Sequence, residues 1–356
     1  MAAPGRYGRD VHRAFPAGRL TDCTACRPRD MLAGQDRFRL LRRSRAGPFF
    51  GRGRRRVEAP KPFRSYEQQL DQLLDRGLIV DDPEQALAWL ARVNYYRLSG
   101  YWYPFRRAED GRRLDEFRHG AAFTDVIALY EFDERLRTAV FAALAPVELS
   151  VRAHLGHALG RLDAAAHLAP EILGPLARKG DAYPVWRRKF ELSVSSSREE
   201  FVEHHRTRYG GVLPVWAAVE VLDWGALVRL FEFAPPVVQH AVATEYSLRA
   251  PQLTSWLRAL NTVRNACAHH GRLFNRVYSK RPKLPPVGSD RSLDFAAASM
   301  NRTFGQLTLV QFLRNEQGVG PSRLMSRVIE SHPDVRFVSP AVIGTRDGWQ
   351  DLPLWR

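Results

Sequence analysis

The sequence predicts an all-α protein, on the strength of three observations. Downstream of residue 60, apolar residues recur every three to four positions in one segment after another, which is the period of a helix with one buried face. Several of these segments begin at a residue that caps helices well, such as Ser65 or Asp82. The alternation of apolar and polar residues that is typical of half-buried strands is not convincing anywhere in the chain. With 356 residues, 45% of them hydrophobic, the chain can bury a substantial core.

The first two helices are predicted from their caps. Ser65-Tyr-Glu-Gln68 fits a capping box, in which the serine and glutamine side chains satisfy each other's backbone N–H groups, and leucines follow at helical spacing. Gly77 is a typical C-terminal stop for this helix. Asp82-Pro83 then opens a second helix, with proline at the first helical position, where its missing N–H does no harm.

Aromatic side chains crowd residues 94–105, after the second predicted helix. Bases of a nucleic acid could stack on such a surface. The alternative, which we favour, is a structural junction in which the rings pack between helices. A long helix is predicted to start at Thr124-Asp125, with an apolar stripe that includes Phe141. Pro146 must kink this helix or separate it from the next one.

The remaining chain is divided by the same criteria. Further helices are predicted near 185–206, 214–233, 251–270, 296–315 and 321–331, and no internal repeat is found. We therefore expect an Arg-rich disordered tail at 1–58, a helical domain at 59–334, and an irregular C-terminal tail at 335–356. The helical domain is expected to consist of an N-terminal helical lobe (59–120) and a helical bundle (121–334).

The formal net charge of +16 is distributed unevenly. Residues 1–58 contain 15 Arg and 5 acidic residues, a net of +10, which leaves +6 for the rest of the chain. A basic balance is compatible with a nucleic-acid partner. The alternative is that the 15 arginines of residues 1–58 belong to a solvated tail, and we favour that interpretation.

Composition argues against several classes of protein. No uninterrupted apolar run approaches the roughly 18–20 residues of a membrane-spanning helix, and the basic N-terminus lacks the apolar segment of a secretory signal. Three cysteines do not make a disulfide scaffold. Cys23 and Cys26 form only half of a zinc site, because no second such pair follows nearby. We therefore expect a cytoplasmic protein with no membrane contact, no metal and no cofactor.

The stretch 261–275 holds the residues best suited to catalysis. It lies at the C-terminal end of a predicted helix that Gly271 is placed to cap. Asn265 and His269 are about 40° apart on one face of that helix, whereas Arg264 is about 140° from His269 and must curl round to meet the same substrate. An imidazole can give or take a proton near neutral pH, and a guanidinium can hold a phosphate. The pattern is therefore suited to phosphodiester chemistry, and a helix C-terminus favours a charged imidazole.

A structural role explains the same residues and is favoured on spacing alone. Histidines at a helix end can bond to the last free carbonyl groups. Cys267 could be imagined as a nucleophile, but residues two apart on a helix point in nearly opposite directions, away from a histidine partner. No carboxylate lies within the stretch, so it does not look like the site of a metal-dependent nuclease.

The segment Arg264-Asn265-Ala-Cys-Ala-His269 resembles the signature of HEPN-type ribonucleases, an arginine and a polar residue followed after a short gap by a histidine. The second histidine, His270, and the following Arg272-Leu-Phe-Asn275 are similar to the Abi family of bacterial abortive-infection proteins, of the AbiD/AbiF kind. Segments upstream match the same family in order, so that the resemblance covers roughly residues 60–315. These segments are Lys61-Pro62-Phe63, Ser65-Tyr66-Glu67, Arg76-Gly77-Leu78, Asn94–Tyr101 and Tyr130–Arg137, followed by Glu148 and Arg152.

The resemblance implies a HEPN-like fold and a metal-independent endoribonuclease of a phage-defence or toxin–antitoxin system. The RNA 2′-hydroxyl would be the nucleophile. His269 would transfer protons, Arg264 would bind the phosphate and Asn265 would position the reacting groups, with His270 and Asn275 in support. Two copies of the motif would face each other in a homodimer. RNA is the implied partner, as substrate or regulatory small RNA, and an antitoxin is a further one.

A second group of polar residues, Glu148, Arg152 and His157, lies on the helix after Pro146. Arg152 and His157 repeat the Arg-x4-His spacing and could form another half of a composite site. The alternative, which we favour, is that the three residues make packing hydrogen bonds that support the main site.

Two functions without catalysis are also open. A non-catalytic RNA-binding sensor or regulator with the same fold would bind RNA with a strong salt dependence and cut none. A DNA-binding regulator could use the helix pair 65–96, which has helix-turn-helix length. Its second helix, however, offers Trp89, Leu90 and Val93 rather than a row of base-reading side chains.

Overall fold

The computed structural model describes residues 61–356, and within them the chain is all-α, as predicted. The predicted tail at 1–58, with Cys23 and Cys26, lies outside the described residues. The described part contains thirteen α-helices and one two-stranded sheet. In chain order these are α1 (Tyr66–Asp75), α2 (Pro83–Val93), α3 (Tyr95–Trp102), β1 (Arg106–Glu109), β2 (Arg112–Phe117), α4 (Phe123–Gly160), α5 (Ala182–Ser196), α6 (Glu200–Arg208), α7 (Val215–Ala218), α8 (Trp224–Phe233), α9 (Pro236–Thr244), α10 (Ala250–Ala268), α11 (Arg291–Ala296), α12 (Thr303–Glu316) and α13 (Arg323–Glu330).

The predicted caps of the first two helices are confirmed. The Ser65 side chain accepts from the N–H of Gln68, and the Gln68 side chain accepts from the N–H of Ser65, which completes the capping box of α1. Gly77 has a φ of 84°, the left-handed conformation expected just after a helix end. Asp82 caps α2, and Pro83 is its first residue.

The β1–β2 hairpin corrects the expectation that strands are absent. The two strands pair antiparallel across Asp110 and Gly111, which both have positive φ. An Asp-Gly pair with this geometry makes the two-residue turn that matches the natural twist of a hairpin. The apolar alternation that would announce these strands is missing, because most of their side chains are exposed to solvent.

Helix α4 runs unbroken through Pro146, so the proline does not separate two helices as the sequence allowed. Proline cannot donate to the preceding turn, and its ring crowds the carbonyl groups there. The guanidinium of Arg314, from α12, donates to the carbonyl of Ala143 at 3.2 Å. This side-chain donor supports the turn that the proline disturbs.

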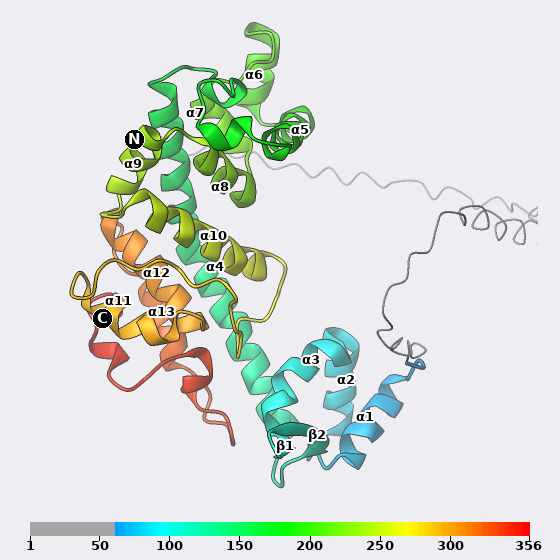
Figure 1. The fold of residues 1–356 in the computed structure, drawn as a ribbon. Helices are drawn as coiled ribbons and strands as arrows, with labels where there is room; N and C mark the ends of the chain where they lie inside the picture. The colour runs from blue at the N-terminus through cyan, green and yellow to red at the C-terminus, as the bar shows by residue number, and fades with distance from the viewer. Residues whose placement is uncertain (1–60) are drawn as a thin grey trace, which may run out of the picture. The chain divides into compact units, whose positions relative to one another are not determined.

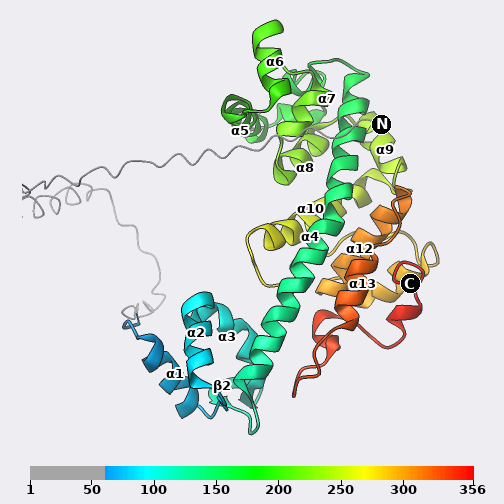
Figure 2. The ribbon, with the colours of Figure 1, turned by 180° about the vertical axis from the view of Figure 1, so that it is seen from behind.

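Helix α4 is the central element of the described chain (Figures 1 and 2). It packs against α3 near its start, against α10, α12 and α13 along its middle, and against α7, α8 and α9 toward its end. By length and composition α4 could cross a membrane, since its most apolar 18 residues have a mean hydropathy of 1.2. Half of that window is buried by the other helices, as is usual for the core helix of a folded domain.

Two of the predicted helices are divided in the structure, and three further helices were not predicted. The segment 185–206 forms α5 and α6, and the segment 214–233 forms α7 and α8, where Asp223 caps a new helix start. Helices α3, α9 and α11 were missed, as all three are short. Near the C-terminus, segments 340–343 and 349–351 form single 3₁₀ turns. Trp355 is buried there against Phe304, with ring centroids 4.8 Å apart.

Candidate active site

The C-terminal end of α10 carries the candidate site, and its cap differs from the prediction by one residue. His269 ends the helix, and His270, rather than Gly271, has the left-handed conformation, with a φ of 54°. The N–H of Gly271 donates to Ala266 O at 2.6 Å, and the N–H of His270 donates to Cys267 O at 3.2 Å. These two hydrogen bonds together form a Schellman cap. Gly271 is closely packed all the same, because a Cβ there would lie 3.2 Å from Ala266 O, a tight contact.

A histidine in a left-handed cap carries a conformational cost that glycine avoids. We therefore expect His270→Gly to raise the free energy of unfolding by about 0.5–1 kcal/mol in denaturant titrations. The matched control is His269→Gly, which should be destabilising because His269 has an ordinary φ of −103°. If His270→Gly were instead less stable than the parent, the His270 side chain would contribute to folding.

Asn265 and His269 present their side chains on the surface. Both residues are exposed, and within residues 61–356 neither side chain hydrogen-bonds to another group. The α-helical geometry places them about 40° apart on the same face of α10. An imidazole and an amide in this position are free to contact a substrate or a second protein chain.

Arg264 turns away from that pair toward α4. Its Nε lies 3.6 Å from Oε2 of Glu148, and its Cζ lies 5.7 Å from the ring centroid of Phe141. The prediction that Phe141 is buried in the stripe of α4 was wrong, because 45% of the residue is exposed beneath this guanidinium. The side chain of Arg264 is 25% exposed, and its Nε has no hydrogen-bond partner among the described residues. Within one chain, Arg264 and His269 therefore do not converge.

Glu148 links Arg264 to Arg152. Oε1 of Glu148 lies 2.5 Å from Nη2 of Arg152, on the same face of α4. Nη1 of Arg152 donates to the carbonyl groups of Val219 at 2.6 Å and Glu220 at 3.1 Å. Arg152 is buried and its donors are taken by these oxygens, so its role in this structure is to hold the Glu148 carboxylate beside Arg264.

His157 and Asn275 do not join this group. His157 is exposed further along α4, where it lines an open hollow of about 320 Å³ beside Trp216. Oδ1 of Asn275 accepts a hydrogen bond from Arg302 at 3.3 Å. Asn275 has a φ of 48°, so it shapes the turn that follows the motif.

Helix α3 clamps the loop that follows α10. The guanidinium of Arg97 donates to the carbonyl of His270, and that of Arg272 donates to the carbonyl of Gly100. A Cβ on residue 100 would meet the end of the flexible Arg272 side chain, which would have to shift. Gly100 therefore lies directly against the arginine that follows the histidine pair.

A buried carboxylate, Asp133, fixes the same loop from α4, although no role was predicted for it. Its Oδ1 accepts from the N–H groups of Phe274 at 2.7 Å and Leu273 at 3.2 Å. Its Oδ2 accepts from the Tyr101 hydroxyl and from Arg137, each at 2.6 Å. Burial raises the pKa of Asp133, while Arg137 and the other donors oppose that rise. The carboxylate thus joins α3, α4 and the end of the motif in one network.

Cys267 has the environment of a structural thiol. It is buried in the core behind the cap, and burial raises its pKa to about 12. A thiol with this pKa is protonated at neutral pH, which makes it a poor nucleophile. Among residues 61–356, no group of three or more His, Cys, Asp or Glu side chains is arranged to hold a metal ion.

Comparison with known proteins identifies one relationship. The sequence model of the family described as Abi-like protein matches residues 88–275, which is more than half of the chain. The match begins in α2 and ends at Asn275, so it contains α3, α4, the Asp133 network and the end of α10. The resemblance noted at Lys61–Leu78 lies outside these residues. No curated protein and no solved structure matches the chain.

Proposed function

The chain belongs to the Abi-like protein family, and on this premise we propose that it is a metal-independent endoribonuclease of the HEPN type that acts in bacterial abortive infection or in a toxin–antitoxin system. The observation that carries the proposal is the end of α10, where His269 and Asn265 are exposed on one face of the helix. The AbiD/AbiF subtype, a location in the bacterial cytoplasm and control by an antitoxin belong to the same proposal.

In the proposed reaction, the RNA 2′-hydroxyl attacks the adjacent phosphorus and the P–O5′ bond breaks. One group must take the proton of the 2′-hydroxyl, and another must give a proton to the departing O5′. The products are a 2′,3′-cyclic phosphate and a 5′-hydroxyl. His269 is the proton-transfer residue and Asn265 orients it or the substrate. Arg264 stabilises the charge that develops on the phosphate oxygens.

The proposal needs two copies of the chain. A single chain offers one His269, whereas the reaction needs both a proton acceptor and a proton donor. The α4 surface next to Arg264 is apolar and open, with Phe141 45% exposed and Leu149 60% exposed. In the proposed dimer the second copy supplies its own His269, and a phosphate replaces Glu148 as the partner of the Arg264 guanidinium.

The alternative function is a non-catalytic RNA-binding sensor or regulator in phage defence. The observation that favours it is the direction of Arg264, which pairs with Glu148 rather than with the face of His269. Such a protein would bind RNA with a strong salt dependence and leave it intact.

Cleavage of single-stranded RNA by the purified chain is expected to continue in EDTA, because the proposed steps use only side chains. The fragments should carry 2′,3′-cyclic phosphate and 5′-hydroxyl ends, which end-labelling before and after phosphate removal can identify. The matched control is a substrate of the same sequence with 2′-deoxy sugars, which lacks the nucleophile and should stay whole. Cleavage that stops in EDTA, or that leaves 5′-phosphate ends, would contradict the proposal; binding without cleavage would favour the sensor.

A further inference from the structure

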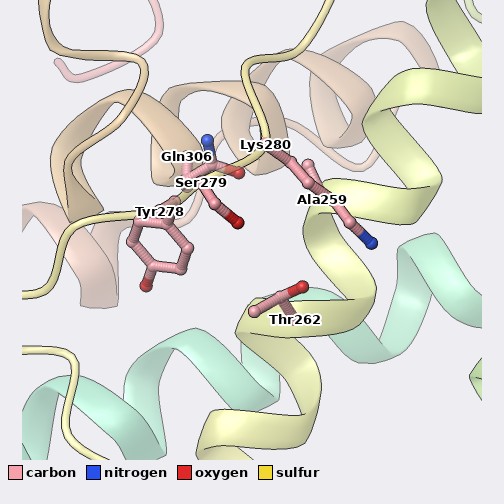
Figure 3. Close-up of a pocket in the computed structure, with 6 residues that line it drawn as sticks. All are labelled: Ala259, Thr262, Tyr278, Ser279, Lys280 and Gln306. Atoms are coloured by element: carbon pink, nitrogen blue, oxygen red, sulfur yellow. The ribbon is translucent and has the colours of Figure 1, made fainter. Parts of the chain in front are cut away.

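The loop that follows the candidate site runs back along α10. Lys280 of this loop lies beside α10, about two turns before the helix ends. There it lines a small cavity of about 20 Å³ together with Thr262 of α10 (Figure 3). Further on, the N–H of Lys283 donates to Oγ of Ser255 at 2.8 Å, and its carbonyl accepts from the indole of Trp256 at 2.8 Å. The loop is therefore fixed beside α10 from the candidate site back toward the start of the helix.

The end of α10 and the loop that follows it form a basic stretch, which contains no acidic residue up to residue 289. Residues 261–289 contain six Lys or Arg residues and no Asp or Glu. Three of the six, Lys280, Arg281 and Lys283, are exposed next to one another. None of the three makes an ion pair with a carboxylate within residues 61–356. Their charge faces solvent without local compensation.

The basic side chains nearer the site are also uncompensated. Nη1 of Arg276 donates to the carbonyl of Arg272 at 3.2 Å, and its Cζ lies 5.4 Å from the ring centroid of Tyr278. Arg302 donates to the amide oxygen of Asn275. These partners are neutral, so they hold the guanidinium groups in place without cancelling their charge.

The exposed cations lie on the side of α10 that carries His269. Thr262 precedes His269 by seven residues, which is close to two full turns and about 10 Å along the helix. Lys280 borders Thr262, so the row of cations starts about two turns from the candidate catalytic histidine and extends away from it.

We propose that Lys280, Arg281 and Lys283 bind consecutive phosphates of single-stranded RNA and guide the strand along α10 to His269. The inference rests on the proposed function for the identity of the ligand, and it adds the path that the RNA strand follows beside the site. Contacts of this kind position the backbone and read no sequence. The track therefore contributes affinity that falls steeply with salt, and leaves the choice of cleavage sequence to other groups.

The test compares RNA binding by three chains that all carry His269→Ala, so that the probe is not cut during the titration. The first has no other change. The second adds Lys280→Gln, Arg281→Gln and Lys283→Gln. The third is the matched control, with Arg188→Gln, Lys189→Gln and Arg198→Gln, three exposed cations on or just after α5, which packs on α8. The probe is a short, end-labelled single-stranded RNA of mixed sequence, and fluorescence anisotropy gives Kd over a series of KCl concentrations.

Loss of three phosphate contacts should make the fall of the log association constant with log salt concentration less steep by about 2. It should also weaken binding at least roughly tenfold at moderate salt. The α5 control should keep both the parent slope and the parent Kd. The track is refuted if the loop variant binds with the parent slope, or if the parent chain shows no salt-dependent RNA binding. Circular dichroism of each chain shows whether it is folded. If the triple variant is not folded, Lys283→Gln alone replaces it, and this single change should make the salt dependence less steep by about 0.7.

The outcome separates the track from the proposed nuclease. If the slope falls as expected while the chain with His269 intact cuts no RNA, the track stands and the ribonuclease proposal fails. If that chain cuts RNA but the loop variant keeps the parent slope, the nuclease stands and the track fails.

Discussion

Asp133→Ala is expected to lower the free energy of unfolding by about 3–5 kcal/mol, because it removes one partner from a buried charged network. The carboxylate is fully buried and accepts from four donors. The variant would leave the Arg137 guanidinium, the Tyr101 hydroxyl and the N–H groups of Leu273 and Phe274 without that acceptor. Each buried donor left unpaired adds its own desolvation cost. Denaturant unfolding followed by circular dichroism measures the change.

The matched control is the exposed pair Arg187–Glu191 on α5, which has the same i,i+4 spacing as Asp133–Arg137. Glu191→Ala should cost only about 0.5 kcal/mol or less, because solvent screens that pair. If Asp133→Ala changed stability no more than Glu191→Ala does, the Asp133 network would not be what holds the loop after α10.

The largest expected effect on activity comes from the motif itself. Arg264→Ala and His269→Ala should each lower the rate of RNA cleavage by about 10²-fold or more, since one removes charge stabilisation and the other removes proton transfer. Neither side chain is buried in the core, so both variants should unfold near the parent midpoint. The rate is measured on labelled RNA with purified, folded chains.

The control for this pair is His240→Ala, a change of the same kind at an exposed histidine on α9. It should leave the cleavage rate unaltered. Equal activity of His240→Ala and His269→Ala would mean that His269 is a structural cap residue, as spacing alone had suggested.

The fold could be predicted from the sequence where local signals act alone. Ser65, Gln68 and Asp82 cap helices through neighbours three residues away, so their positions are readable in the sequence. The hairpin was missed because its strands expose most of their side chains and show no apolar alternation. Its Asp110-Gly111 turn was the available signal.

The site could be predicted only in part, because its decisive contacts are distant in sequence. Asp133 bonds to Tyr101, 32 residues away, and to Leu273, 140 residues away, and no local pattern reveals such partners. The cap was placed at Gly271 because glycine is the usual left-handed residue, whereas the structure uses His270. His269 is then the C-cap residue of α10, where it is exposed.

The central claim, that His269 is the catalytic residue of a ribonuclease, is tested most directly by expressing the wild-type chain and His269→Ala side by side in bacteria and sequencing the RNA ends in both. The account predicts that the wild type produces new 5′-hydroxyl ends, and that these ends disappear in the variant while the amount of soluble protein stays the same. New ends that persist unchanged when His269 is replaced would contradict it.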